Sequence, residues 1–381
     1  MDTNNFEFKF LTSIEQINRR EWNSLVDGGF PFIQYEYLHA LESSGCVNLH
    51  TGWQPNHLIV YLNKQIVALA PAYIKSHSYG EYVFDFQWAN AFHQSGLNYY
   101  PKLLSAIPFT PCAGERLCIK SEYRESLQPL MIEQLVNFAK RQNISSWHLL
   151  FPENELSTVK QNSDLVQRSG MQYHWFNKHY RSFSEFLAGC KMKQRKNIKR
   201  ERRIVADSGV KLRVVEGGNI TQALWERFYY FYQRTYAKRS GNTGYLNQSF
   251  FETIGRTMAS DLMMVVASLE TDVIAASLFF KSKNVLYGRY WGASAEFEFL
   301  HFEACYYQGI EYCIDQGLDH FDAGAQGEHK IPRGFEPIET YSYHWINDEQ
   351  FRRAISNFVN QEELVVKSNI NELKRKLPYR R

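Results

Sequence analysis

The stretch from Phe321 to Phe335 carries the densest set of groups that could perform chemistry. It follows an apolar segment and contains three glycines, two acids, one imidazole and two cations. Glycine lets a backbone approach a ligand closely, and this mixture is more typical of a substrate-facing loop than of a packing element. We predict that His329 transfers a proton and that Lys330 and Arg333 present positive charge to a phosphate or carboxylate. A solvated connector with helix-stopping glycines is the structural alternative.

Glu303 is a second candidate, because it is the only charge on an otherwise apolar helical face. The residues that share this face follow a 3,4,3,4 spacing and are Leu300, Glu303, Tyr307, Ile310 and Ile314. Burial would raise the pKa of Glu303 and make it an acid or a base. An ion pair with Arg289 on the preceding strand would instead keep it ionised and structural.

Two carboxylates and two basic groups lie close together in the first half of the chain. Glu81 and Asp85 are four residues apart, so an extended segment would place both on the same side. Lys75 and His77 precede them by a few residues. This mixture predicts a site for a zwitterionic or peptide-like substrate, and a polar loop that closes a hairpin is the alternative.

The segment 191–203 reads KMKQRKNIKRERR, which is eight cations against one acid. Cations that contact a nucleic-acid backbone release its condensed counterions, so the segment predicts contact with a polyanion such as tRNA. Two alternatives remain open. The cations could pair with acids elsewhere on the protein, or the helix could have a weak membrane-surface role.

Bulk properties limit the classes of protein that fit. A chain of 381 residues exceeds the roughly 250 to 300 residues at which one hydrophobic core stops growing, so two domains are expected. The net charge of +3 is too small to indicate nucleic acid by itself. A polar N-terminus, the lack of a long apolar window and cysteines without CxxC or CxxH spacing predict a cytoplasmic protein with no transmembrane segment and with reduced thiols.

Several familiar signatures are missing from the sequence. It contains no P-loop, no dinucleotide-binding glycine fingerprint, no zinc-protease motif and no serine-hydrolase elbow. The twelve histidines are scattered along the chain. We therefore expect no metal site and no tightly bound cofactor.

Hydrophobic periodicity predicts the elements that position these residues. In chain order they are a helix at 14–25, a hairpin at 57–62 and 65–74, strands with a long loop over 75–111, a basic helix at 184–207, an aromatic helix at 222–238, strands at 263–269, 273–281 and 285–291, a helix at 299–316 and a C-terminal helix at 348–376. Helix, hairpin, strand and helix recur in the same order in both halves, which favours a duplicated α/β unit. The predicted domains are 1–179 and 180–381.

Five blocks of sequence are distinctive when they are taken together. They are Pro71–Asp85, Tyr99–Lys102 with Pro108–Pro111, Gly288–Gly292, His301–Tyr307 and Gly324–Lys330. In these blocks the chain resembles the FemAB-related family of bacterial proteins, which is placed among the GNAT-like acyltransferases and linked to peptidoglycan biosynthesis or recognition. The resemblance extends over nearly the whole chain.

This resemblance implies an α/β (α+β) fold, a tandem pair of GNAT-like domains with mixed, largely antiparallel sheets flanked by helices. It also implies an N-acyltransferase of Fem type that moves an acyl or aminoacyl group to an amine of a peptide-like or small-molecule acceptor. The donor would be aminoacyl-tRNA, which is favoured, or acyl-CoA. CoA-dependent GNAT enzymes usually carry a glycine-rich pyrophosphate loop, and here residues 291–298 are acidic at that position. The helical arm of Fem proteins is not evident.

The site expected from these arguments has a catalytic and a substrate-binding part. The catalytic candidates are His329, Glu303 and Glu328. The substrate-binding candidates are Lys75, His77, Glu81, Asp85, Arg289, Tyr290, Trp291, His301, Gln326, Lys330 and Arg333. We expect the residues near 75–85 and those of 289–333 to converge on one charged hollow. A CoA-dependent acyltransferase and a non-catalytic protein that recognises a peptide or cell-wall precursor are the alternatives, and the sequence does not indicate an oligomeric state.

Overall fold

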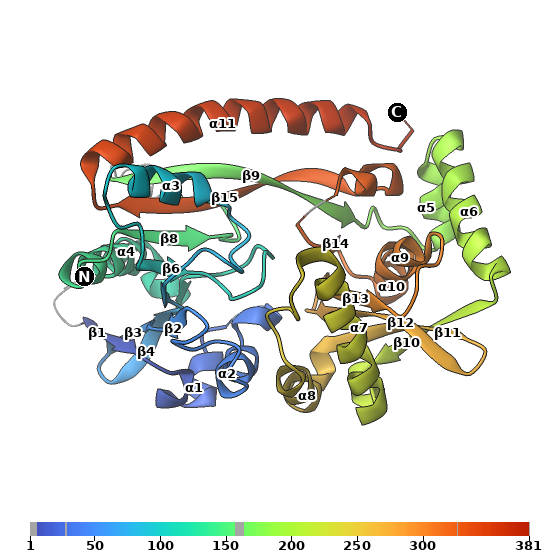
Figure 1. Ribbon diagram of the computed structural model, residues 1–381, viewed down its shortest axis with the longest axis horizontal. Helices are drawn as coiled ribbons and strands as arrows, with labels where there is room; N and C mark the ends of the chain where they lie inside the picture. Colours follow the sequence, from blue (N-terminus) through green and yellow to red (C-terminus); the bar gives the residue numbers. More distant parts are fainter. Residues whose placement is uncertain (1–5, 27–28, 157–163, 326, 381) are drawn as a thin grey trace. The chain divides into compact units, whose positions relative to one another are not determined.

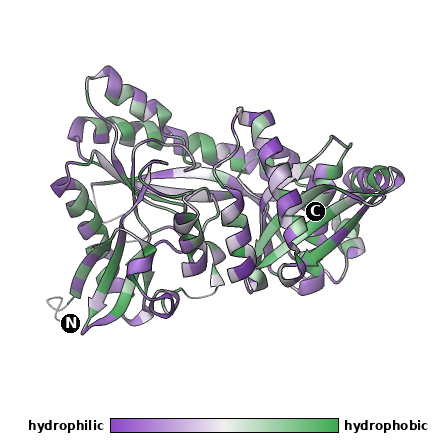
Figure 2. Ribbon diagram, turned by 60° about the horizontal axis from the view of Figure 1, so that its bottom comes forward, coloured by the Kyte–Doolittle hydropathy of each residue, from purple (hydrophilic) through white to green (hydrophobic). Residues whose placement is uncertain are grey.

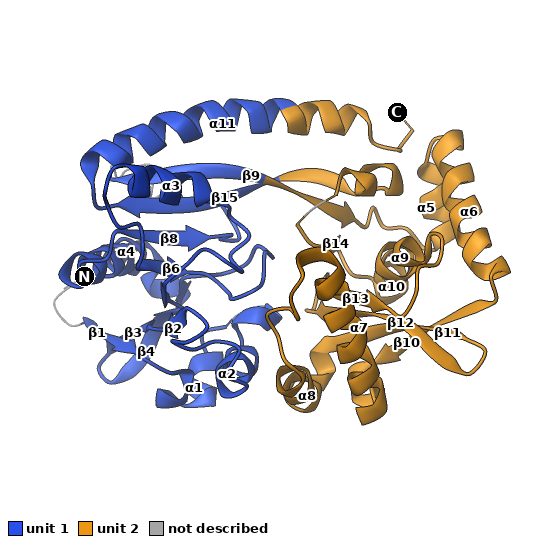
Figure 3. Cartoon of the chain, in the orientation of Figure 1, with its two compact units in different colours: residues 1–170, 339–368 blue, residues 171–338, 369–381 orange. Residues whose placement is uncertain are grey.

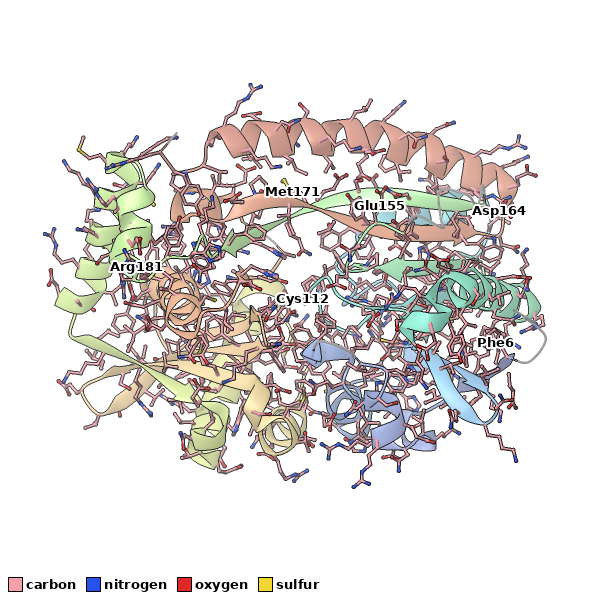
Figure 4. The ribbon with its side chains drawn as sticks, turned by 180° about the vertical axis from the view of Figure 1, so that it is seen from behind. Phe6, Cys112, Glu155, Asp164, Met171 and Arg181 are labelled. Carbon is pink, nitrogen blue, oxygen red and sulfur yellow. The ribbon has the colours of Figure 1, made fainter. Side chains whose placement is uncertain are left out.

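The structure is a computed structural model that describes residues 6–26, 29–156, 164–325 and 327–380. It forms two compact units (Figure 3). Unit 1 consists of Met1–Gly170 and Glu339–Ser368, and unit 2 consists of Met171–Ile338 and Asn369–Arg381. The chain first enters unit 2 at Met171, which is labelled in Figure 4.

Three elements carry the chain from one unit to the other. They are β9 (Leu165–Phe176), β15 (Glu336–Ile346) and α11 (Glu349–Arg375). The compact units differ from the predicted domain limits, 1–179 and 180–381, because most of β15 and the first part of α11 group with unit 1. Hydrophobic periodicity is a local signal and does not report that β15 pairs with a strand almost 200 residues earlier. Those domain limits stay a prediction.

Unit 1 contains two sets of strands flanked by helices (Figure 1). One sheet has the order β1-β3-β4-β7, and a second run has the order β15-β8-β6-β5-β2. Its elements are β1 (Phe6–Leu11), α1 (Arg19–Asn23), α2 (Tyr35–Ser43), β2 (Trp53–Pro55), β3 (His57–Leu62), β4 (Gln65–Ala70), β5 (Tyr73–Lys75), α3 (Phe86–Gln94), β6 (Lys102–Ser105), β7 (Cys118–Ile119), α4 (Arg124–Arg141) and β8 (Ser146–Leu150). The core between strands and α4 includes Leu58, Leu103 and Trp147, which are fully buried.

Unit 2 is built on strands in the order β10-β11-β12-β13-β14-β9. Only the β13–β14 pair is parallel among these neighbours. Its elements are α5 (Phe183–Gly189), α6 (Met192–Asp207), β10 (Val210–Glu216), α7 (Gln222–Ser240), α8 (Gln248–Thr257), β11 (Leu262–Leu269), β12 (Asp272–Lys281), β13 (Val285–Ala293), α9 (Leu300–Phe302), α10 (Gln308–Gln316) and β14 (His320–Asp322). Hydrophobic residues concentrate on the strands and polar ones on the outer helices (Figure 2).

The two units repeat one arrangement. In unit 1 the order is β1, α1, α2, the short strand β2 and then the hairpin β3–β4, and in unit 2 it is β10, α7, α8 and then the hairpin β11–β12. In both units the first strand pairs antiparallel with the first strand of the hairpin. The predicted fold class, mixed α/β with largely antiparallel sheets flanked by helices, is confirmed.

Several predicted elements are altered by local capping. The helix expected at 14–25 is a short 3-10 turn followed by α1, because the Asn18 side chain accepts a hydrogen bond from the Arg20 amide and starts a new helix. The long loop over 75–111 contains α3. The basic helix expected at 184–207 is divided into α5 and α6 at Cys190, whose backbone is extended. The C-terminal helix is confirmed as α11. Periodicity did not indicate β9, β10, β15 or α8.

We expect Gly292→Ala to destabilise unit 2 because α7 passes directly over β13 at this glycine. A Cβ atom on Gly292 would lie 2.3 Å from the backbone carbonyl carbon of Phe231, which cannot move without shifting the helix. Overpacking of this kind costs about 1–3 kcal/mol. Urea denaturation should show that loss in the free energy of unfolding. Gly218→Ala is the matched control, since nothing lies within 4 Å of its Cβ position, and an equal loss there would contradict the steric explanation.

Candidate functional site

A π-helical turn lies in the middle of the helical segment that the sequence predicted at 299–316. It spans Glu303–Tyr307 and connects α9 to α10. π turns are rare and are frequent at functional sites. The predicted apolar face is confirmed, since Leu300, Glu303, Tyr307, Ile310 and Ile314 are all buried.

Glu303 is held by Arg202 of α6. The Arg202 Nη2 and Nε atoms lie 3.0 and 3.2 Å from Glu303 Oε1, and Gln308 donates a further hydrogen bond of 2.8 Å. The partner is therefore Arg202 and not Arg289, which was the partner suggested by the sequence. Because the carboxylate is occupied on both sides, the geometry favours the structural role of Glu303, and its catalytic role stays a prediction.

His329 is exposed, and Tyr306 holds its ring. The Nε2 atom of His329 lies 2.9 Å from the Tyr306 hydroxyl, which comes from the π-helical turn. Burial raises the pKa of Tyr306, so the phenol stays protonated. Partial burial, followed by the charges of Lys330 and Arg333, lowers the pKa of His329. The result is a neutral imidazole that is open to solvent and fixed on one side, as a proton acceptor requires.

A second imidazole completes this group. The ring of His301 lies 5.6 Å from Trp291, 5.3 Å from Tyr306 and 6.5 Å from His329. Burial, followed by the charge of Arg239 at the end of α7, lowers the pKa of His301 to about 3. Unit 2 therefore brings Trp291, His301 and His329 together around Tyr306, a residue that the sequence analysis did not select. Its position within the distinctive His301–Tyr307 block was the available signal.

Lys330 and Arg333 are buried and bonded to protein groups. The Lys330 ammonium donates a hydrogen bond of 2.5 Å to the carbonyl oxygen of Gly324. Arg333 donates one of 2.8 Å to Glu201 on α6, and its guanidinium lies 3.5 Å from the centre of the Phe302 ring. Both cations therefore stabilise the loop and contribute positive potential. Their predicted contact with donor phosphates stays a prediction.

The other predicted residues of unit 2 lie at varied positions. Glu328 is exposed at the start of the 3-10 helix Glu328–Arg333. Tyr290 is buried, and its ring packs 5.7 Å from that of Phe251 on α8. The Arg289 guanidinium lies 5.2 Å from the Tyr290 ring. Gln326 lies outside the described residues.

In unit 1, Lys102 is the centre of the charged cluster. Its side chain is fully buried on β6 and donates hydrogen bonds of 2.8 Å to both Glu81 Oε2 and Ser78 Oγ. It also pairs with Asp85, which accepts a 2.6 Å hydrogen bond from the Tyr99 hydroxyl. Glu81 and Asp85 thus converge as predicted, but on a shared cation and not on a strand. The sequence analysis missed Lys102, although a lysine that opens an apolar strand is itself a signal.

Burial and the shared lysine move the two carboxyl pKa values in opposite directions. Burial raises the pKa of Glu81 to about 7, against the attraction of Lys102. Burial also acts to raise the pKa of Asp85, but the charge and hydrogen bond of Lys102, together with His148 and Ser78, lower that pKa to about 2. At neutral pH the cluster therefore holds one permanent carboxylate and one carboxyl group that exchanges its proton readily.

Lys75 is a buried amine beside this cluster. It lies directly opposite Lys102 in the β5–β6 register, and its Nζ atom is 3.8 Å from the centre of the Trp53 ring. Its hydrogen bonds, to the Tyr79 carbonyl and to His77 Nδ1, are long at 3.3 and 3.4 Å. Burial lowers the pKa of Lys75 to about 7. Unit 1 therefore offers both an amine and a carboxyl group that titrate near neutrality.

The two groups of predicted residues belong to different compact units, and their convergence on one hollow stays a prediction. Within unit 2 the arrangement can accept a proton in a positive environment. Within unit 1 the charged cluster is buried, and the contact of Lys75, Glu81 and Asp85 with a ligand stays a prediction. Among the described residues, no cluster of three or more His, Cys, Asp or Glu side chains is arranged to hold a metal ion. None of the described helices combines the length and apolar character needed to cross a bilayer.

Comparison with known proteins identifies the family. The profile of the FemAB-like family, described as concerned with peptidoglycan biosynthesis/recognition, matches residues 13–381. The chain belongs to the FemAB-like family. This confirms the resemblance that the five distinctive blocks of sequence indicated. No functionally curated protein matches the sequence.

Solved structures share the fold of this FemAB-like protein at low sequence identity. FemX is 13% identical with a TM-score of 0.56, and the match covers 89% of this chain and 98% of FemX. The C-terminal domain of a putative lysylphosphatidylglycerol synthetase from Agrobacterium fabrum is 9% identical with a TM-score of 0.52, covering 90% and 96%. A conserved protein of unknown function from Bacteroides thetaiotaomicron is 8% identical with a TM-score of 0.51, covering 89% and 99%. The fold is therefore an acyltransferase-type fold of the Fem kind.

We expect stability to fall with rising pH because of Glu81. Its folded pKa of about 7 lies above the 4.5 of a free glutamate, so between these values the folded state holds a proton that the unfolded chain has released. The free energy of unfolding should fall by roughly 3 kcal/mol from pH 4.5 to pH 7. Glu81→Gln should remove most of this fall in urea denaturation at pH 5 and pH 7.5. Glu133→Gln, an exposed site on α4, should keep it, and equal pH profiles for both variants would contradict the assignment.

Proposed function

We propose that this FemAB-like protein is an N-acyltransferase that moves an acyl or aminoacyl group from an activated donor to an amine. The observation that carries the proposal is the exposed, neutral His329 held by the buried Tyr306 hydroxyl. The amine attacks in its neutral form, after its ammonium has released one proton to solvent, and the nitrogen must lose a second proton as the amide bond forms. A fixed neutral imidazole is the group best suited to take that proton.

The reaction follows from this geometry. The amine nitrogen attacks the carbonyl carbon of the donor, a nitrogen–carbon bond forms, and the carbonyl electron pair moves onto oxygen. The tetrahedral intermediate then expels the leaving oxygen or sulfur, and the proton taken by His329 passes to that leaving group. The positive charges of Lys330, Arg333 and Arg239 around this imidazole favour the negative charge that develops on oxygen.

We favour aminoacyl-tRNA as the donor. The acidic stretch 291–298 is a poor cradle for the pyrophosphate of CoA, whereas the basic segment 191–203 is suited to a polyanion. A tRNA donor would place the reaction in the cytoplasm. The acceptor is a peptide-like amine, and the unit 1 cluster of Lys75, Glu81 and Asp85 supports a ligand of mixed charge, with His77 beside it.

We expect His329→Ala to lower kcat by about 100-fold while the protein stays folded, because proton transfer in the transition state is lost. Turnover would be measured with aminoacyl-tRNA and with acyl-CoA in separate assays, using a peptide amine as acceptor. The control is His50→Ala, which removes an exposed imidazole of unit 1. Near-normal turnover by His329→Ala would contradict the assignment. Absence of turnover by the wild-type protein with every donor, despite tight precursor binding, would favour a recognition protein.

We expect Arg239→Gln to move the acid limb of the kcat/KM profile to higher pH. Arg239 lowers the pKa of His329, so its removal raises that pKa, and the base is then lost by protonation at a higher pH. NMR titration of the His329 ring should show the same direction without any substrate. Arg234→Gln, five residues earlier on α7, is the control for loss of a cation on the same helix. An unchanged His329 titration in Arg239→Gln would exclude this electrostatic contact.

A further inference from the structure

Two basic segments that are distant in sequence lie side by side in unit 2. The amide of Lys191 donates a 2.6 Å hydrogen bond to the carbonyl of Pro378, and the amide of Arg380 donates one of 3.0 Å to the carbonyl of Gly189. Cys190 and Tyr379 form a β-bridge between these bonds. The C-terminus therefore runs antiparallel to the junction of α5 and α6, and Figure 1 shows it at the end of these helices.

The tail is fixed in this position by side chains as well. The Tyr379 hydroxyl donates a 2.6 Å hydrogen bond to the carbonyl of Gly334, and the Lys178 ammonium lies 3.9 Å from the centre of the Tyr379 ring. The Lys191 ammonium donates a 2.9 Å hydrogen bond to the carbonyl of Leu377. The two basic segments are consequently parts of one structured surface.

Exposed cations from both segments make up this surface, which we call the composite basic surface. It consists of Lys191, Lys193, Lys196, Lys374, Arg375 and Arg380. Within the described parts of the chain, none of these six side chains forms an ion pair with an acid. Lys376, by contrast, is paired with Glu372 at 2.5 Å. The sequence left open that the cations of 191–203 pair with acids elsewhere on the protein. Among the residues that the structure describes, the six cations of the composite basic surface do not form such pairs.

Three side chains of α6, those of Ile198, Glu201 and Val205, are buried in unit 2, whereas Met192 is a single exposed apolar side chain at its start and Asp207 is exposed at its end. Glu201 pairs with Arg333, and Ile198 and Val205 are buried. Because the apolar stripe of α6 is already used inside the unit, the helix has no apolar face left to insert into a bilayer. The outer face has uncompensated positive charge, and a polar polyanion fits it better than a lipid surface.

We propose that the composite basic surface binds the phosphodiester backbone of RNA. Lysine and arginine contact phosphates without reading bases, and each such contact releases counterions. The inference rests on the proposed function for the identity of the RNA, a tRNA donor, and it adds the C-terminal tail to the contact. The proposal requires the two segments to bind together. They could not do so if the tail were not held beside α6.

The test is binding of deacylated tRNA, measured by fluorescence anisotropy across a range of salt concentrations. Two double variants, K193Q/K196Q on α6 and K374Q/R375Q at the end of α11, where the tail begins, each remove two cations, and glutamine keeps the helix propensity. Each pair should weaken binding roughly tenfold and reduce the slope of log K against log salt by about 1 to 2. Combining the two pairs should reduce the slope further.

The control is R256Q/K283Q, which removes two exposed cations from α8 and from the turn between β12 and β13. It should bind tRNA like the wild type. Tail variants that behave like this control would overturn the composite surface. If the four substitutions abolish binding to phosphatidylglycerol vesicles but leave tRNA binding unchanged, RNA is not the partner.

The outcome is separable from that of the proposed reaction. His329→Ala should bind tRNA as tightly as the wild type, because the imidazole is not one of the six cations. If the protein turns over acyl-CoA and the four substitutions do not change tRNA binding, the composite basic surface is wrong and the proposed transferase reaction stands. Cation-dependent tRNA binding without turnover from any donor would support the surface and overturn the reaction.

Discussion

The buried ion pair between Arg333 and Glu201 is the contact on which the unit 2 site depends. It joins the 3-10 helix that carries His329 to α6, and the Tyr307 hydroxyl, bonded to the same carboxylate, adds the π-helical turn to this link. A buried charge that loses its partner costs about 3–5 kcal/mol, so each of these elements holds the others in place. An imidazole can therefore be exposed to solvent and still be fixed opposite Tyr306.

Unit 1 uses the same principle with the opposite arrangement of charge. There one buried cation, Lys102, holds two carboxylates, and the second lysine in register with it is left against an aromatic ring. Like charges on directly opposed strand residues repel each other, and both carboxylates of the cluster are bonded to Lys102. Burial therefore lowers the pKa of Lys75. In each unit, paired buried charges fix the backbone. In unit 1, Lys75 is the amine that this pairing leaves out, and it titrates near neutrality.

Local pattern predicted the elements better than it predicted the partners. The hairpins, the buried face around Glu303 and the C-terminal helix follow from periodicity, because burial of one face repeats along the chain. Arg202, Lys102 and Tyr306 became visible only in the structure, since each acts on a residue brought to it by tertiary contacts. The buried residues keep their 3,4 spacing in sequence across the π-helical turn, so the hydrophobic pattern could not reveal the change in hydrogen bonding. Glu81 and Asp85 share a side as predicted, but the cause is Lys102 and not an extended strand.

The basic segment 191–203 shows why a count of charges is an incomplete guide to function. Its eight cations look equivalent in sequence, yet Arg202 spans Glu303 and Glu311, while Lys193 and Lys196 face solvent. Removing Arg202 would leave the Glu303 carboxylate buried without its cation, so such a variant reports on the folding of unit 2. Lys193 and Lys196 are exposed and form no buried ion pair within the described chain, so their substitution tests binding to an external partner and not the folding of unit 2. One helix thus separates into a structural face and an exposed basic face, and only substitutions on the exposed face can test the proposed polyanionic partner.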